Sequence, residues 1–353
     1  MKKQLLTLAV ACAAPLANAG TVTSAGDDLV IDTKGGFEVY TADKSKSFKL
    51  GGRIMWDYDS TDSDDDSKDS DDMEVRRARI YASGNVNDWE YKAQFNINNA
   101  SNDYEDLYIR YNGFGKKASI TVGNHHEPFG LDQLTSSNDM PLLERAAVTE
   151  SYTPGRSEGI SLSGKDSNWT YGIGVYEADG DAENTALTGR LTYVPFQNDN
   201  SLVHLGVGFS SRDAEMSDDE VDVIGLEAAY VVGAFHAQAE YFDAEFGDQD
   251  EDGYYVQVGY VLTGEMRPYK DGKFKRVKAS GDSGAWEIVL RYEDGFAKYS
   301  DIGLSTAEGS QTSFGVNYYL NDNVRMGASY MTGENDASGL DGNELRLRLQ
   351  FTY

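Results

Sequence analysis

The chain has 353 residues, and its 59 aspartates and glutamates against 31 lysines and arginines give it a formal net charge of −28. Such a surplus of negative charge argues against binding to nucleic acid, whose phosphate backbone attracts positively charged surfaces. The single cysteine, Cys12, excludes a disulfide framework. The chain is rich in tyrosine (23) and glycine (37) and poor in proline (6).

Residues 1–19 have the features of an export signal. Two lysines precede an apolar stretch, and Ala17-Asn18-Ala19 supplies the small-x-small cleavage site. We therefore expect residues 1–19 to be a signal peptide and residues 20–353 to form one exported domain. A lipoprotein cut before Cys12 is the alternative, but it would leave a very short apolar run. Cleavage after Ala19 removes the only cysteine, which suits an oxidising compartment.

After the signal, apolar and polar residues alternate in short runs along almost the whole chain. In residues 89–98, for example, Trp89 and Tyr91 share one face, whereas Glu90 and Lys92 share the other. Turn-forming sequences separate the runs, and no segment approaches the ~20 apolar residues of a membrane-spanning helix. The pattern predicts an all-β fold of about sixteen antiparallel strands.

The final residues, 343–353, alternate in the same way and end in the aromatic Tyr353. Behind an export signal, such a strand favours a transmembrane β-barrel over a soluble β-sandwich, which would bury the same apolar faces in a core. Strand counting from a periplasmic N-terminus places the first outer loop at residues 57–72, with nine acidic residues. This loop is either a solvated segment or a surface that bridges divalent cations to lipid head groups.

Two motifs resemble metal sites, but neither has the required spacing. Residues 248–253 begin like a calcium loop, yet Gly259 occupies the position of the bidentate glutamate. His125, His126 and Glu127 are consecutive, and neighbouring side chains in a strand point to opposite faces. The chain contains no recognisable nucleophile or phosphate-loop motif. We therefore expect no metal, no cofactor and no enzymatic activity.

Net charge does not decide what a pore conducts, because the charge of its lining matters more. In residues 49–58, Leu50 and Trp56 belong to the lipid-facing phase, so Arg53 points inward. The same argument places Arg77 and Arg79 inside and Arg76 near the rim. Further arginines fall on inward phases: Arg110, Arg190, Arg291, Arg325, Arg346 and Arg348. Because inward acids are also present, both cross-strand pairing and anion selection remain open interpretations.

Two segments break the alternation. Residues 125–145 contain Pro128 and Gly130 around Phe129, and about thirty residues pass before the next strand. Residues 263–286 are the most basic stretch of the chain and are too long for a periplasmic turn. Folded into the barrel they would form a cationic throat, whereas outside it they would be a solvated basic loop.

Several of these segments resemble the phosphate-selective porins O and P of Gram-negative bacteria. The resemblance is carried by GGRIMWD, VRRARIYASG, GNHHEPFGLDQLTSS and LTGEMRPYK…FKRVK…GAWEIVLRYE. It spans nearly all of the exported chain. It implies a sixteen-stranded barrel in the outer membrane, a homotrimer, and passive uptake of phosphate or polyphosphate. It also implies that residues 125–145 form an inward-folded constriction loop.

The resemblance also assigns roles to individual residues. Arg53, Arg76 and Arg77 match a ladder of arginines, and Asp106 matches an acid near the constriction. Ser136 and Ser137 match hydroxyls that bind the anion, and Thr135 beside them would also face the passing ion. The family's inward-folded periplasmic segment contains four basic residues here: Lys270, Lys275, Arg276 and Lys278.

Gln133 departs from the family pattern. Phosphate-binding members carry a lysine at this position, three residues before the paired serines. Replacing that lysine with a neutral amide weakens a charge-assisted contact to the anion. Phosphate preference therefore depends on what else lines the constriction.

We expect a trimeric outer-membrane porin that passes small inorganic anions, in contact with outer-membrane lipid or lipopolysaccharide. Its expected anion pathway contains Arg53, Arg76, Arg77, Arg79, Asp106, Arg110, Gln133, Thr135, Ser136, Ser137, Lys270, Lys275, Arg276, Lys278, Arg346 and Arg348. Two alternatives stay open. The chain could be a general or weakly selective diffusion porin, or a surface protein whose acidic loops serve adhesion.

Overall fold

The computed structural model describes residues 20–23, 28–33, 36–64, 68–98, 104–178, 181–213, 220–247 and 249–353. The expected signal peptide, residues 1–19, lies outside these ranges.

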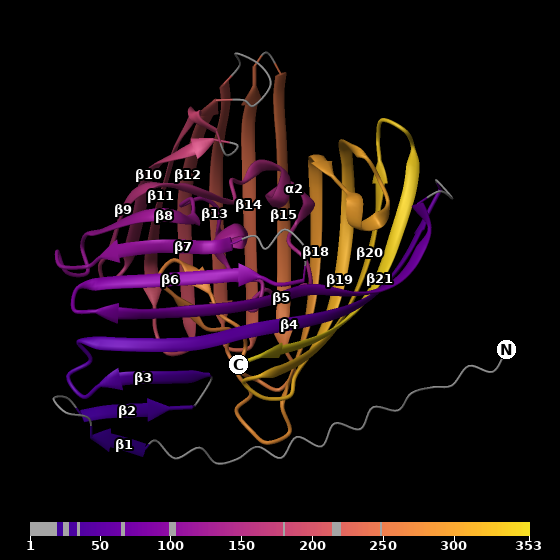
Figure 1. The fold of residues 1–353 in the computed structure, drawn as a ribbon. Helices are drawn as coiled ribbons and strands as arrows, with labels where there is room; N and C mark the ends of the chain where they lie inside the picture. The colour runs from indigo at the N-terminus through magenta and orange to yellow at the C-terminus, as the bar shows by residue number, and fades with distance from the viewer. Residues whose placement is uncertain are drawn as a thin grey trace.

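Within the described residues, sixteen antiparallel strands close into a barrel (Figure 1), as the sequence predicted. Each strand of the barrel pairs with the next one along the chain, and β21 pairs with β4 to close the ring. The strands are β4 (Lys46–Ser63), β5 (Ser70–Val86), β6 (Trp89–Asn96), β7 (Tyr104–Tyr111), β8 (Ser119–His126), β9 (Arg156–Lys165), β10 (Trp169–Ala178), β11 (Asp181–Gln197), β12 (Ser201–Asp213), β13 (Glu220–Val232), β14 (Phe235–Phe246), β15 (Gln249–Val261), β18 (Ala285–Lys298), β19 (Thr306–Tyr319), β20 (Val324–Asn335) and β21 (Leu340–Thr352).

The two-residue period of the strands separates an apolar outer face from a polar inner face. Trp56 and Leu347 are 47% and 43% exposed, whereas Arg53 and Arg348 are 7% and 4% exposed. Outward side chains would meet lipid, and inward ones line the lumen. The phase predicted for Arg53 is therefore the one the structure shows.

Three further strands precede the barrel: β1 (Gly20–Thr23), β2 (Asp28–Asp32) and β3 (Phe37–Thr41). β3 pairs with residues 47–50 of β4, whereas β21 pairs with residues 53–63 of the same strand. The three strands therefore extend the wall beyond the end of β21, an addition that strand counting did not predict.

The predicted first outer loop, residues 57–72, was too long. β4 continues to Ser63 and β5 begins at Ser70, so most of the acidic stretch is strand. Asp57 is only 1% exposed and its carboxylate accepts hydrogen bonds from Arg348. An inward basic partner explains why an acid-rich sequence continues the strand instead of forming a solvated loop.

Residues 127–155 connect β8 to β9 and fold into the barrel as a constriction loop. The loop contains two short helices, α1 (Leu131–Leu134) and α2 (Ala147–Tyr152), and α2 packs against β14, β15 and β18 (Figure 1). A 3₁₀ turn, η2 (Ser300–Ile302), lies in the outer connection between β18 and β19. None of the helices among the described residues is long and apolar enough to cross a membrane.

The inner wall beneath the constriction loop is lined with glycines. A Cβ atom added to Gly225 would lie 2.9 Å from the ring of Phe129, and one added to Gly208 would lie 3.0 Å from it. Other wall glycines lie under further apolar loop residues: Gly172 under Pro128, Gly253 under Val148, Gly315 under Leu142, and Gly327 under Leu143. The absent side chains therefore leave the space that the loop occupies.

The basic segment between β15 and β18 also folds into the barrel. It forms a hairpin of β16 (Tyr269–Lys270) and β17 (Lys273–Phe274), turned by Asp271 and Gly272 at φ 53° and 79°. Two consecutive positive φ angles are typical of a type I′ turn. Phe274 is fully buried in one cluster with Leu131 of α1, so the periplasmic segment and the constriction loop meet inside the barrel.

We predict that Gly225→Val displaces the constriction loop. The added side chain would overlap the Phe129 ring, and overpacking of this kind costs about 1–3 kcal/mol. Single-channel conductance in a planar bilayer should rise and its selectivity should fall. Gly281→Ala is the control, because a Cβ there meets nothing within 4 Å. Unchanged conductance in Gly225→Val would show that Phe129 does not hold the loop.

Candidate functional site

Glu144, in the constriction loop, is the carboxylate on which the arginine ladder converges. Its two oxygens are paired with four arginines: Arg76, Arg77, Arg346 and Arg348. Arg77 binds in a bidentate manner at 3.0 and 2.9 Å, and Arg348 lies at 2.6 Å. Burial alone would raise the pKa of Glu144, but Arg77, Arg348 and Arg76 hold this pKa well below its usual range.

A β-bulge explains how two consecutive arginines reach one carboxylate. The β4–β5 register shifts between Met55 and Trp56, so Arg76 is an extra residue without a partner across the ladder. Arg76 therefore turns toward Glu144 together with Arg77, rather than remaining at the rim as the strand phase predicted.

Arg346 and Arg348 are also held by acids of the neighbouring strand. Arg348 donates to both oxygens of Asp57 at 2.7 and 2.5 Å, and Arg346 pairs with Asp59. The backbone carbonyl of Leu143 accepts another hydrogen bond from Arg348. These arginines are thus engaged in fixing the constriction loop to the seam between β21, β4 and β5.

A second group of cations lies on β5 to β9. Arg156 binds Asp106 at 2.8 Å and Glu105 at 2.9 Å, and Lys92 binds Asp106 at 2.5 Å. Arg79 pairs with Glu105 as well. Here three cations share two carboxylates, so this part of the lumen wall carries a surplus of positive charge.

Arg110 lies on β7, the strand that pairs with the β6 strand of Lys92. It is 3.4 Å from Glu90 and donates to the hydroxyl of Thr121 at 2.9 Å. Its guanidinium also lies 5.1 Å from the centre of the Tyr108 ring.

The side chain of Arg53 has no hydrogen-bond or ion-pair partner among the residues that the structure describes. It is 7% exposed and lies opposite Arg79 in the β4–β5 register. The charged groups that act on it are mainly cationic: Arg77, Arg79 and Arg156, against Glu105. A guanidinium in such surroundings retains free hydrogen-bond donors.

The polar residues of the constriction loop are only partly free. Gln133 donates to the carbonyl of Pro154 at 3.1 Å, and the hydroxyl of Thr135 donates to that of Leu131 at 2.8 Å. The hydroxyl of Ser136 accepts a hydrogen bond from the backbone of Asn138. Ser137 is 6% exposed, and its hydroxyl is unpaired within the described part of the chain.

The basic residues of the periplasmic segment have different surroundings. Lys275 lies 3.3 Å from Asp139 of the constriction loop, and Arg276 donates to the carbonyl of Asp322. Lys270 and Lys278 are exposed, and neither has a partner among the described residues. Only some of the expected cations are therefore brought to the constriction.

The expected pathway omitted four basic residues that the structure brings to the constriction: Lys92, Arg145, Arg156 and Lys273. Lys92 could have been found from its inward phase in residues 89–98. Lys273 could have been found from the Asp271-Gly272 pair, which is the strongest short signal for a hairpin. Arg145, which donates to the backbone carbonyls of Asp132, Gln133 and Thr135, carried no such signal.

The constriction loop and the cations occupy opposite parts of the lumen wall. The glycines beneath the loop belong to β10, β12, β13, β15, β19 and β20. The cations around Arg53 belong to β4 through β9. The wall that the loop leaves uncovered is therefore the wall that carries these cations and the carboxylates paired with them.

His125, His126 and Glu127 do not come together as ligands. His125 bonds to Ser161 at 2.8 Å, whereas Glu127 accepts hydrogen bonds from Ser157 and Arg212. Among the described residues, no group of three or more potential ligands could hold a metal ion.

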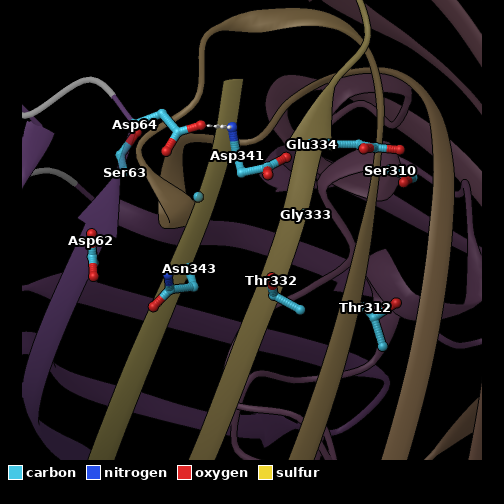
Figure 2. A pocket seen from close by; sticks show the side chains of 11 residues that line it. Asp62, Ser63, Asp64, Ser310, Thr312, Thr332, Gly333, Glu334, Asp341 and Asn343 are labelled. Atoms are coloured by element: carbon cyan, nitrogen blue, oxygen red, sulfur yellow. Dashed lines mark hydrogen bonds between the residues drawn. The ribbon is translucent and has the colours of Figure 1, made fainter. Parts of the chain in front are cut away.

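An acidic pocket lies at the outer rim, between the ends of β4, β19, β20 and β21 (Figure 2). Its acidic side chains are Asp62, Asp64, Glu334 and Asp341. On β20, the side chain of Thr332, which lines the pocket, is exposed, whereas that of its neighbour Met331 is buried. Neighbouring side chains of a strand point to opposite faces of the wall. The pocket therefore opens on the outer face of the wall and not into the lumen.

Comparison with known proteins agrees with this architecture. The family model described as phosphate-selective porin O and P matches residues 48–221 and 214–353. Porin O of Pseudomonas aeruginosa is 30% identical, over 95% of this chain and 95% of its own length.

Two solved structures have a similar fold. The anion-selective porin from Comamonas acidovorans has a TM-score of 0.62 at 14% identity and covers 87% of this chain and 100% of its own. OmpT of Vibrio cholerae, in a trimer form, has a TM-score of 0.56 at 12% identity and covers 88% and 100%. The chain therefore belongs to the phosphate-selective porin O and P family, as its sequence motifs indicated, and it is a channel of the bacterial outer membrane.

Proposed function

We propose that this porin conducts small inorganic anions and prefers oxyanions of the phosphate type. The observation that carries the proposal is Arg53, a buried guanidinium without a partner among the described residues, surrounded mainly by other cations. Guanidinium groups suit phosphate because they present planar, paired donors, and the hydroxyl of Ser137 adds a neutral donor. The family's description and the Arg- and Lys-bearing wall support the same assignment.

The basic residues divide into two roles. Arg76, Arg77, Arg346 and Arg348 anchor the constriction loop through Glu144, so carboxylates already neutralise most of their charge. Arg53, Arg79 and Arg156, with Lys92, supply the surplus charge that an anion would meet. Binding has to stay weak enough for ions to leave, and partial neutralisation by Asp106 serves that requirement.

We further propose that the porin works as a homotrimer, as its resemblance to the family and the trimer form of the Vibrio cholerae OmpT structure suggest. Outer-membrane lipid is the second proposed partner. The lipid-facing side chains of the strands, such as Trp56 and Leu347, are the surface that would contact it.

The purified porin should be anion-selective in planar bilayers. Its reversal potential in a KCl gradient should have the sign expected for chloride, and added phosphate should reduce the chloride current. A cation-selective channel would overturn the proposal. Weak selectivity without phosphate block would favour a general diffusion porin, and absence of conductance would favour the adhesion alternative.

Arg53→Met should lower the anion selectivity of the channel while its conductance changes little, because Arg53 holds no part of the constriction loop. The matched control is Arg348→Met, which removes an arginine that binds both Asp57 and Leu143. That control should increase open-channel noise. The assignment of roles would be wrong if the two variants had the same effects.

Glu144→Gln should loosen the constriction loop. Removing one partner of a buried ion pair typically costs about 3–5 kcal/mol, because the remaining charges stay buried. We expect more frequent voltage-induced closures together with stronger anion selectivity, since four arginines lose a common counter-charge. Single-channel recordings would measure both quantities. A drop in anion selectivity would contradict this role for Glu144.

A further inference from the structure

Gln133 occupies the constriction as a structural residue. It is 7% exposed, and its amide donates to the carbonyl of Pro154 at 3.1 Å. A neutral side chain held in this way adds no positive charge at the constriction. If the porin prefers phosphate, that charge has to come from another residue.

One strand that contacts α1, the helix of Gln133, is β17, and it begins with Lys273. The residues beside Lys273 are anchored on both sides. The carbonyl of Gly272 accepts a hydrogen bond from Arg190 at 2.8 Å, and Phe274 is fully buried in one cluster with Leu131. The backbone of Lys273 is therefore fixed next to α1, a helix that contains no basic residue.

Lys273 is a half-buried cation without a hydrogen-bond or ion-pair partner in the described part of the chain. The four basic residues that act on it are Lys275, Arg190, Lys92 and Arg110. Each of these four is paired with a carboxylate, namely Asp139, Glu227, Asp106 and Glu90, respectively. Lys273 is thus the cation of this group that is left without a counter-charge.

The electrostatic surroundings of Lys273 agree with a site for an anion. Burial, together with Lys275, Arg190, Lys92 and Arg110, lowers the pKa of Lys273 to about 8. His126 also lies within electrostatic range of Lys273. An anion bound beside Lys273 would offset the repulsion between these cations and stabilise the ammonium form.

We propose that Lys273 supplies the positive charge that the constriction loop lacks at Gln133 and that it selects oxyanions there together with Arg53. The proposal rests on the anion-conducting function proposed above. It places the selecting cation on the periplasmic segment, where the hairpin positions it, instead of on the constriction loop.

Phosphate block of the chloride current at pH 7 tests this role. Lys273→Gln should weaken the block about tenfold, the loss expected for one charge-assisted contact. Lys273→Arg should retain most of it, because the charge is kept. Lys116→Gln, at an exposed periplasmic turn, is the control and should match the wild type. Heat-modified migration on gels would verify that each variant assembles as a barrel.

The pH profile supplies a second readout that a purely structural lysine would not affect. Lys273 is charged below its pKa of about 8 and neutral above it, so block should weaken between pH 7 and pH 9. Sulfate is the probe for this series because it remains a dianion throughout. The pH dependence should vanish in Lys273→Arg, whose guanidinium stays protonated.

The outcomes separate the two proposals. Cation selectivity in the wild type would overturn the anion-conducting function itself. An anion-selective wild type whose block is the same in Lys273→Gln would overturn only the role of Lys273. Loss of block in both Lys273→Gln and Lys273→Arg, with an assembled barrel, would also count against a role for the charge.

Discussion

An irregular segment buried inside a barrel has to find hydrogen-bond partners for its backbone, because neither strand pairing nor bulk water satisfies it. The wall of this porin supplies them. Arg291, Arg325 and Arg348 donate to carbonyls of the constriction loop. Glu240 accepts from the amides of Leu131 and Asp132, where α1 begins. Much of the charge in the lumen therefore holds the loop in place, and only the remainder is free to meet a solute.

This division changes how the arginines are interpreted. A ladder of inward arginines suggests a continuous path for anions, yet Glu144 and Asp57 neutralise the members near the seam of β4 and β21. The free positive charge lies instead around Arg53 and along the wall that the loop leaves uncovered. The glycines opposite Phe129 and the other apolar loop residues decide which wall is covered, so packing determines which charges the solute can reach.

The sequence predicted the barrel, its strand number and the inward phase of Arg53, because a two-residue period determines which face each side chain occupies. It missed the position of Arg76, since a bulge shifts the register after Met55. It also predicted that the first acidic loop begins at residue 57, although β4 continues to Ser63. The strand continues because Asp57 and Asp59 bind arginines on β21, a strand at the other end of the chain.

The sequence by itself therefore determined the alternation, the two inserted segments and the departure at Gln133. Only the tertiary structure decided which charges are paired. Arg77 and Glu144 are 67 residues apart and Asp57 and Arg348 are 291 apart, so no local pattern links them. Barrel closure and loop docking bring such residues together, and the same contacts leave Arg53 and Lys273 without a counter-charge among the described residues. Charge selection in a pore depends on the charges that remain unpaired, and the folded chain determines which charges these are.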